Sequence, residues 1–177
     1  MSVRKPKTLD REALMAYAAR VLGGRAQSIS ELREKLIRRA SSREDVTDVL
    51  DRLKRSGFLD DRRLAASFAS WRLETQGQGK ARVMRDLMAR RVAPAVAREA
   101  ADAAYNKVDE IALIENFLRR KYRGKDLPSL LGEEKNMASA YRKLRLAGFT
   151  SGNSIRVLKR YAASGEGLEG MEEEAAE

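Results

Sequence analysis

The pair Asp60-Asp61 is the arrangement in this sequence that comes nearest to metal-binding or catalytic chemistry. Two adjacent carboxylates could contribute to a magnesium site, but the octahedral geometry of Mg²⁺ would need further carboxylates converging on them. The nearest acidic residues, Asp51 and Glu74, fall on other turns and indicate no such cluster. Helix capping, in which the helix dipole favours negative charge at the first turn, explains the pair without a metal.

The residue types that carry most enzyme chemistry are missing. The chain has no histidine, which removes the usual general base near neutral pH and imidazole metal ligands. It has no cysteine either, which excludes thiolate nucleophiles, zinc–thiolate sites and disulfides. No glycine-rich phosphate loop is present, and Gly77-Gln78-Gly79-Lys80 is interpreted as a helix breaker with a basic neighbour. We therefore expect a protein that is not an enzyme, with no catalytic residues, no cofactor and no metal.

The charge of the chain is its main chemical signal. There are 36 Lys and Arg against 26 Asp and Glu, a net charge of +10. Residues 166–177 hold six glutamates and no basic residue, so the remainder carries 36 basic against 20 acidic residues, a net charge of +16. Such a body is expected to attract a polyanion: nucleic acid, a nucleoprotein or an acidic protein groove. The alternative is a merely soluble basic surface, and the acidic tail could itself mimic DNA and shield the basic face.

Basic residues on the predicted helices form the candidate binding face. For any one of them, a solvated helix face or a helix C-terminus is the simpler interpretation, so the prediction concerns the set. The candidate residues are Lys80, Arg82, Arg85, Arg90, Arg91, Arg119, Arg120, Lys121, Arg123, Lys125, Arg142, Lys143 and Arg145. Among the aromatic residues, Trp71 shares a helical stripe with Leu64 and Phe68 and is expected to be buried, whereas Tyr122 is expected to be exposed.

Apolar residues recur at helical spacing almost throughout, and no stretch alternates like a strand. Capping residues predict helices beginning after Ser28, Ser42 and Asp60, and Pro94 suits the first position of another. Residues 124–132 are predicted to form a loop or short turn. No apolar run approaches the roughly 18 residues that span a bilayer, and no secretory signal is recognisable, so we expect a cytoplasmic protein that does not contact membranes.

The predicted helices group in threes at a period of roughly 50 residues. The expected fold is all-α, with three tandem three-helix repeats that form an elongated, curved body. The predicted divisions are a flexible basic N-terminus (1–9), helical repeat 1 (10–57), helical repeat 2 (58–107), helical repeat 3 (108–163) and a disordered acidic tail (164–177).

The joint between the first two repeats is the most specific segment of the sequence. It reads Gly57-Phe58-Leu59-Asp60-Asp61-Arg62-Arg63-Leu64-Ala65. Gly57 can adopt the left-handed conformation that ends a helix, an aspartate then begins the next helix, and Phe58 and Leu59 are expected to pack into the corner between the helices.

These residues resemble the RecX regulators of the RecA recombinase. The family pattern is Gly, an aromatic residue, Leu or Ile and Asp-Asp, followed by a basic helix that ends here with Trp71-Arg72. Two further segments, Ser28-x-Ser30-Glu31-Leu32-x-x-Lys35-Leu36 and Gly79-x-x-x-Val83-x-x-x-Leu87, resemble the signatures of the first and second repeats. Arg91-Val92 stands where the family usually has Gly-Ile, and the acidic tail is not part of the pattern.

The resemblance implies a regulator that lodges in the groove of the RecA nucleoprotein filament. It would inhibit or modulate filament growth, ATP hydrolysis, strand exchange and co-protease activity in DNA repair. Expected partners are the RecA filament and, weakly, single- and double-stranded DNA, and the expected state is a monomer. The alternatives are a freestanding basic DNA-binding protein with helix–turn–helix-like repeats and a scaffold for another acidic protein.

Overall fold

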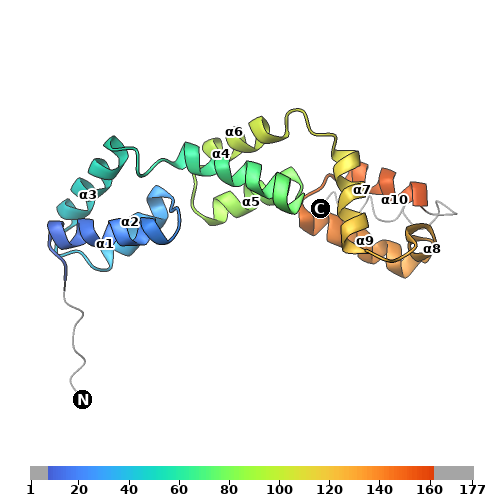
Figure 1. Ribbon diagram of the computed structural model, residues 1–177, viewed down its shortest axis with the longest axis horizontal. Helices are drawn as coiled ribbons and strands as arrows, with labels where there is room; N and C mark the ends of the chain where they lie inside the picture. The colour runs from blue at the N-terminus through green and yellow to red at the C-terminus, as the bar shows by residue number, and fades with distance from the viewer. Residues whose placement is uncertain (1–7, 162–177) are drawn as a thin grey trace, which may run out of the picture. The chain divides into compact units, whose positions relative to one another are not determined.

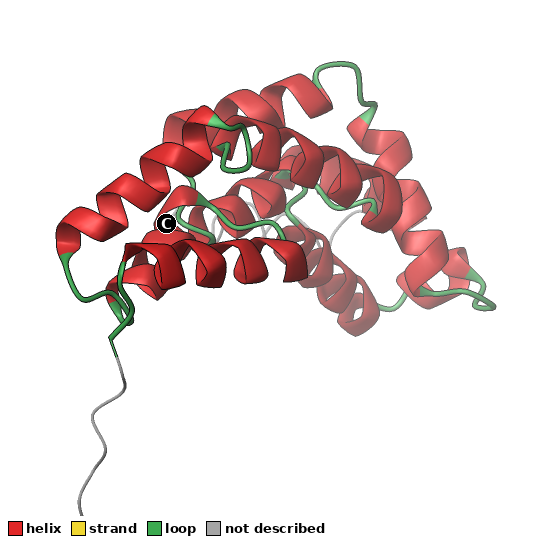
Figure 2. Ribbon diagram, turned by 60° about the vertical axis from the view of Figure 1, so that its left-hand side comes forward, coloured by secondary structure: helices red, strands yellow, loops and turns green. Residues whose placement is uncertain are grey.

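The computed structural model describes residues 8–161, and this part of the chain is built from helices (Figures 1 and 2). An isolated bridge joins Leu9 to Ala40, and the described residues form no strand beyond it. The all-α prediction is thus confirmed. The elements are α1 (Arg11–Gly24), α2 (Ile29–Ile37), α3 (Arg43–Arg55), α4 (Asp61–Trp71), the π-helical turn η1 (Arg72–Gln76), α5 (Lys80–Ala89), α6 (Pro94–Tyr105), α7 (Glu110–Lys121), α8 (Leu127–Leu131), α9 (Glu134–Ala147) and α10 (Ser151–Tyr161).

The predicted helix starts are confirmed by their capping bonds. Ser28 forms a capping box with Glu31, in which each side chain accepts from the backbone N–H of the other residue. The Ser42 side chain accepts from the Asp45 amide, and the Asp60 carboxylate accepts from the first-turn amides of α4. The prediction for residues 124–132 missed α8, a single short helix that the Asp126 side chain caps.

One joint geometry recurs three times along the chain. Gly57, Arg91 and Gly148 each end a helix with a positive φ, of 72°, 59° and 92° respectively. At each joint this residue donates its N–H to the carbonyl three residues back, and the next residue donates to the carbonyl five residues back. This bond pair is the Schellman motif. Arg91 therefore adopts the conformation that a glycine would adopt there.

The described chain divides into two compact units. Unit 1 comprises the residues up to Ser67 together with Leu87–Ala100, and unit 2 comprises Phe68–Asp86 together with the residues from Ala101 onward. In unit 1, α1, α2 and α3 enclose a core formed by Leu14, Ala18, Leu32, Leu36, Val46, Val49, Leu50, Leu53 and Leu59. The boundaries proposed from sequence for the three repeats stay predictions.

In unit 2, helices α7 to α10 enclose a second core. Its largest fully buried side chains are Phe149, Ile114, Leu118, Leu131, Leu144 and Leu158. The rings of Phe149 and Phe117 pack edge to face with centroids 5.4 Å apart. This core holds the joint between α9 and α10 against α7, and it places the ends of these helices for the surface described below.

The start of α5 lies directly against the α9–α10 joint. The Gly79 amide donates to the Ala147 carbonyl at 2.9 Å, and the Ala81 amide donates to the Gly148 carbonyl at 3.2 Å. A Cβ atom on Gly79 would lie 2.3 Å from the carbonyl carbon and oxygen of Gly148. Because backbone meets backbone here, Gly79 does more than break a helix, which is all that the sequence suggested.

Three predictions about aromatic residues are wrong or need revision. Phe58 does not pack into the corner beside the buried Leu59, since it is 71% exposed. Trp71 is 47% exposed rather than buried, and the guanidinium of Arg72 lies 5.3 Å from the centroid of its ring. Tyr122 is partly buried against the unit 2 core, and Lys143 donates to its hydroxyl at 3.1 Å.

Two predicted segments involve residues that the structure does not describe. The flexible basic N-terminus falls mostly on residues 1–7, and the acidic tail lies wholly within residues 162–177. Over residues 8–161, no helix has the length and apolar character needed to cross a bilayer.

Candidate interaction surface

The candidate basic residues of unit 1 are engaged in structural contacts. Arg90 donates to the carboxylate of Glu31 at 3.0 Å and to the carbonyl of Ala26 at 2.6 Å. Its side chain is 17% exposed and that of Glu31 15% exposed, so the pair holds the start of α2 from within the fold. Arg91 forms an ion pair with Glu34. These two arginines therefore stabilise the helical packing of unit 1.

The carboxylates beside this pair have shifted pKa values. Burial alone raises the pKa of Glu31, but hydrogen bonds from Arg90 and the Ser28 amide, with the charge of Arg25, bring that pKa below its ordinary value. Burial raises the pKa of Asp61, although its carboxylate accepts from the Ile29 amide. The opposite shifts follow from the partners, since Glu31 has cationic donors and Asp61 lies near other carboxylates.

The Asp60-Asp61 pair caps two different helices. Asp60 caps α4, as expected, whereas Asp61 accepts from Ile29 at 2.8 Å and so caps α2. The sequence indicated capping but not that the second carboxylate serves a helix more than thirty residues upstream. Within residues 8–161 no cluster of three His, Cys, Asp or Glu residues could hold a metal ion.

In unit 2, the candidate residues at the start of α5 also make structural contacts. Lys80 pairs with Asp102 at 2.5 Å, and Arg82 pairs with Asp86 at 3.0 Å. Arg85 donates to the carbonyl of Leu146 at 3.0 Å, in the last turn of α9. Cations at this position satisfy carbonyls that the helix leaves unpaired at its C-terminal end.

Two cations near the end of α9 also make structural contacts. Arg145 donates to the carbonyl of Phe149 at 2.6 Å, and Lys143 lies over the ring of Tyr122 at 5.0 Å. Arg142, on the same helix, is exposed. The Arg142 side chain forms no hydrogen bond or ion pair within the described residues, which leaves its guanidinium available to a partner.

The end of α7 gathers the densest group of basic side chains. Arg120 donates to the carbonyl of Gln76 at 2.7 Å, and Arg119 donates to the Asn116 side chain at 2.8 Å. Lys121, Arg123 and Lys125 are exposed and form no hydrogen bond or ion pair through their side chains within the described residues. Three positive charges at a helix C-terminus are favourable there, and they leave a cationic edge that faces solvent.

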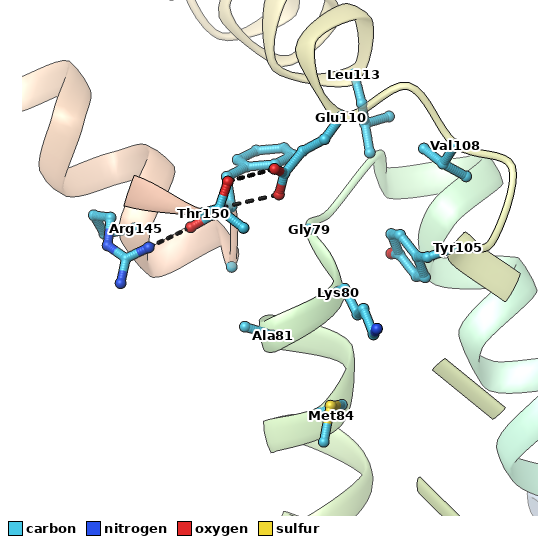
Figure 3. A pocket seen from close by; sticks show the side chains of 12 residues that line it. Gly79, Lys80, Ala81, Met84, Tyr105, Val108, Glu110, Leu113, Arg145 and Thr150 are labelled. Carbon is cyan, nitrogen blue, oxygen red and sulfur yellow. Dashed lines mark hydrogen bonds between the residues drawn. The ribbon is translucent and has the colours of Figure 1, made fainter. Parts of the chain in front are cut away.

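An apolar pocket of about 350 Å³ lies where α5, α7 and the α9–α10 joint meet (Figure 3). Figure 3 shows Glu110 reaching Thr150, whose amide donates to that carboxylate at 2.9 Å. The Tyr105 hydroxyl donates to the Gln78 carbonyl at 2.6 Å, and burial raises the pKa of Tyr105 to about 12. The polar groups at the rim thus hold the helices together rather than presenting a reactive group.

Sequence reasoning missed one network in unit 2, which is centred on the partly buried pair Arg72 and Asp86, with side chains 21% and 19% exposed. The guanidinium of Arg72 lies 4.9 Å from the ring of Phe68 and 5.3 Å from that of Trp71, and it pairs with Asp86 at 3.1 Å. The adjacent Trp71-Arg72 was visible as a motif, but its sequence alone does not indicate that the guanidinium lies over the ring.

Comparisons with known proteins agree with the motifs. The family model for the second three-helix domain of RecX matches residues 60–100. The regulatory protein RecX of Deinococcus radiodurans is 34% identical over 148 residues, which are 82% of this chain and 68% of that protein. RecX of Thermus thermophilus is 31% identical over 153 residues, which are 86% of this chain and 95% of that protein.

Solved structures show the same fold. The crystal structure of RecX from Lactobacillus salivarius matches with a TM-score of 0.64 at 14% identity, covering 85% of this chain and 96% of that one. A second crystal structure of regulatory protein RecX matches with a TM-score of 0.61 at 19% identity, covering 84% and 73%. The all-α fold of three-helix repeats expected from the sequence is thereby confirmed. Motifs, relatives and fold together show that the chain belongs to the RecX family of non-enzymatic regulatory proteins.

Proposed function

We propose that this protein binds the RecA nucleoprotein filament and inhibits or modulates its ATPase, strand-exchange and co-protease activities. Family membership supports the regulatory role. The observation that carries the proposal is the group of exposed cations without structural partners at the end of α7, formed by Lys121, Arg123 and Lys125. The fold does not need these charges for its own packing, so they are free to meet an anionic surface.

The binding face proposed here is narrower than the full set of basic residues. Cations such as Arg90 and Arg85 are engaged in intramolecular bonds, and using them for a partner would break contacts that hold helices together. Lys121, Arg123 and Lys125 at the end of α7, together with Arg142 of α9, can bind a partner without breaking such contacts. Each exposed ion pair contributes only about 0.2–1 kcal/mol, so binding requires several contacts at once. A filament supplies them because its subunits repeat, and linked weak contacts then gain affinity through avidity.

The test is RecA ATPase activity on single-stranded DNA, titrated with this protein, alongside its binding to the same DNA alone. Inhibition at concentrations well below those that coat free DNA supports action on the filament. Inhibition that begins only when the DNA is saturated would favour the freestanding DNA-binding protein. No inhibition at any concentration would contradict both the RecA proposal and its implied mechanism.

A matched pair of variants tests the proposed face. Arg123→Gln, Lys125→Gln and Arg142→Gln remove three unpartnered charges from unit 2. Arg43→Gln, Arg52→Gln and Arg55→Gln remove the same charge from unit 1, and serve as the control. We expect the first variant to need at least a tenfold higher concentration for half-maximal inhibition of the RecA ATPase. The control should change this concentration less than threefold. Equal losses in the two variants would show that net charge alone, and not this face, determines binding.

The salt dependence of binding distinguishes contacts with DNA phosphates from contacts with acidic residues of RecA. If the three cations of unit 2 each met one DNA phosphate, their removal would lower the salt dependence of binding to single-stranded DNA by about 2 log units per log unit of salt. An unchanged salt dependence with weaker filament binding would assign the same cations to acidic residues of RecA. Cytoplasmic residence, a monomeric state and weak binding to free DNA remain part of this proposal.

A further inference from the structure

We propose that the acidic C-terminal segment of this chain, residues 166–177, docks in a cationic groove between η1 and the end of α7 and competes there with anionic partners. This groove has a volume of about 480 Å³. Arg119, Arg120 and Arg123 line one side, and Glu74 and Gly77 line the other. The proposal concerns the protein alone and does not depend on its regulating RecA.

The groove keeps an excess of positive charge. Within the described chain, none of its three arginines takes part in an ion pair. Arg120 is anchored by the carbonyls of Thr75 and Gln76, which hold its guanidinium at the groove without neutralising it. Glu74 is the single acidic side chain among the residues that line the groove. An occupant with several carboxylates would therefore gain charge-assisted hydrogen bonds that the groove cannot make internally.

The path of the chain brings the tail to this groove. Helix α10 packs against α7, and Arg160 near the end of α10 pairs with Glu115 of α7 at 3.0 Å. Glu115 lies one helical turn before Arg119, a rise of about 5–6 Å. The last described residue, Tyr161, follows Arg160 directly and packs against the core that α7 helps to form. The tail thus leaves the described structure beside the helix whose end lines the groove.

Length and charge both fit this occupant. From Tyr161 to Glu166 the chain can span up to about 17 Å, and residues 166–177 can span roughly 40 Å more. The segment holds six glutamates and no basic residue. A tethered segment of this length acts at an effective concentration in the millimolar range, so even individually weak ion pairs suffice for docking.

Competition between the acidic tail and a labelled oligonucleotide measures how strongly the tail docks in the groove. The probe is fluorescein-labelled oligodeoxythymidine, whose anisotropy reports binding to the full chain and to a chain truncated after Gly165. We expect truncation to tighten probe binding about three- to tenfold, as an effective concentration a few times the docking constant would give. A full-length variant in which the six tail glutamates are glutamine should match the truncated chain.

The groove variant makes the test specific. In a chain carrying Arg119→Gln and Arg123→Gln, truncation should change probe affinity less than 1.5-fold. The same truncation in a chain carrying Arg52→Gln and Arg55→Gln should keep its full effect. If truncation tightens binding equally in the groove variant, the tail acts by diffuse charge and the docking site is refuted. If truncation of the otherwise unmodified chain does not change the probe affinity, the tail does not occupy the groove and the proposal fails. The groove would then be open to nucleic acid or another partner.

A direct measurement covers the case in which the probe binds too weakly. A labelled peptide of residues 162–177 is added to the truncated chain and followed by anisotropy. It should bind at millimolar or lower concentration and lose at least threefold in affinity with the groove variant. Absence of peptide binding would overturn the proposal. A tail effect that grows with protein concentration, together with dimers in sedimentation, would assign the contact to a second copy and also overturn it.

Discussion

Replacing Gly79 by alanine tests the contact between the start of α5 and the α9–α10 joint. Gly79 and Gly148 meet backbone to backbone, and the added Cβ would lie 2.3 Å from the Gly148 carbonyl carbon and oxygen and 2.6 Å from the Phe149 nitrogen. These atoms belong to the backbone, so no side chain can rotate away. Ordinary contact begins at 3.4 Å, so the two segments must separate by about 1 Å.

The cost follows from what that separation breaks. Two backbone hydrogen bonds join the segments, from Gly79 to Ala147 and from Ala81 to Gly148, and each contributes about 1 kcal/mol. Overpacking a well-packed contact by one methyl group adds about 1–3 kcal/mol. Because the hydrogen bonds lengthen rather than vanish, we expect the Gly79→Ala variant to lose about 2–4 kcal/mol of unfolding free energy in unit 2.

Urea unfolding followed by tryptophan fluorescence measures this loss, because the single tryptophan, Trp71, lies in unit 2. The control is Gly152→Ala, since a Cβ at that helical position meets nothing within 4 Å. The control should be unchanged or more stable by up to about 1 kcal/mol. If the unfolding free energy of Gly79→Ala lies within 0.5 kcal/mol of that of the unmodified protein, the two backbones do not approach each other as closely as described.

Three further substitutions test individual contacts. Arg90→Ala should cost about 2 kcal/mol at neutral pH. The pKa of Glu31 is lowered in the folded state. The part of the stability loss that depends on the Glu31 charge is therefore present above the ordinary pKa of 4.5 and shrinks as pH falls through the folded-state pKa. A loss of stability that does not depend on pH would contradict the pairing of Arg90 with Glu31. Asp61→Asn should not destabilise the protein at neutral pH, because burial raises the pKa of Asp61 and folding therefore disfavours its charge. Any gain in unfolding free energy should disappear at low pH, so a gain that persists below the ordinary pKa of 3.8 would refute this reason. Tyr105→Phe leaves the Gln78 carbonyl without its 2.6 Å donor and should cost about 1–3 kcal/mol in chemical denaturation. The pKa of Tyr105 is raised to about 12, so this contribution is complete below its ordinary value of 10 and is lost as pH rises through 12; an unchanged stability in the variant would contradict the hydrogen bond.

Local signals in the sequence predicted the helices well because capping is a local interaction. Ser28 with Glu31 and Ser42 with Asp45 satisfy amides three residues away, so spacing alone predicts the bonds. Asp61 satisfies an amide at Ile29, and no spacing rule connects these positions. The same limit applies to Gly79, whose partner Gly148 comes from a distant helix joint.

Side-chain exposure was the least predictable property. A helical stripe predicted Trp71 to be buried, but its side chain is 47% exposed, with the guanidinium of Arg72 at 5.3 Å from the ring centroid. Phe58 and Phe149 follow equivalent left-handed glycines, and yet Phe149 is 1% exposed and Phe58 71% exposed. Burial depends on which helices surround a joint, and a motif of a few residues does not carry that information.

The candidate binding face could be predicted as a charge excess but not residue by residue. Counting charges gave a strongly basic body, and it treated Arg145 and Arg142 alike. The two residues lie three positions apart on one helix, but the Arg145 side chain donates to the Phe149 carbonyl, whereas the Arg142 side chain forms no hydrogen bond or ion pair within the described residues. Only the positions of carbonyls and carboxylates across the fold separate cations that stabilise it from cations available to a partner.

The proposed regulatory role on RecA is tested most directly by comparing two affinities of the labelled protein at physiological salt. One is measured on RecA filaments assembled on single-stranded DNA with a non-hydrolysable ATP analogue, and the other on the same DNA without RecA. We expect binding to the filament to be at least tenfold tighter, and weakened by loss of Arg123, Lys125 and Arg142. Equal affinity for filament and bare DNA would contradict the account, because the protein would then recognise phosphates alone.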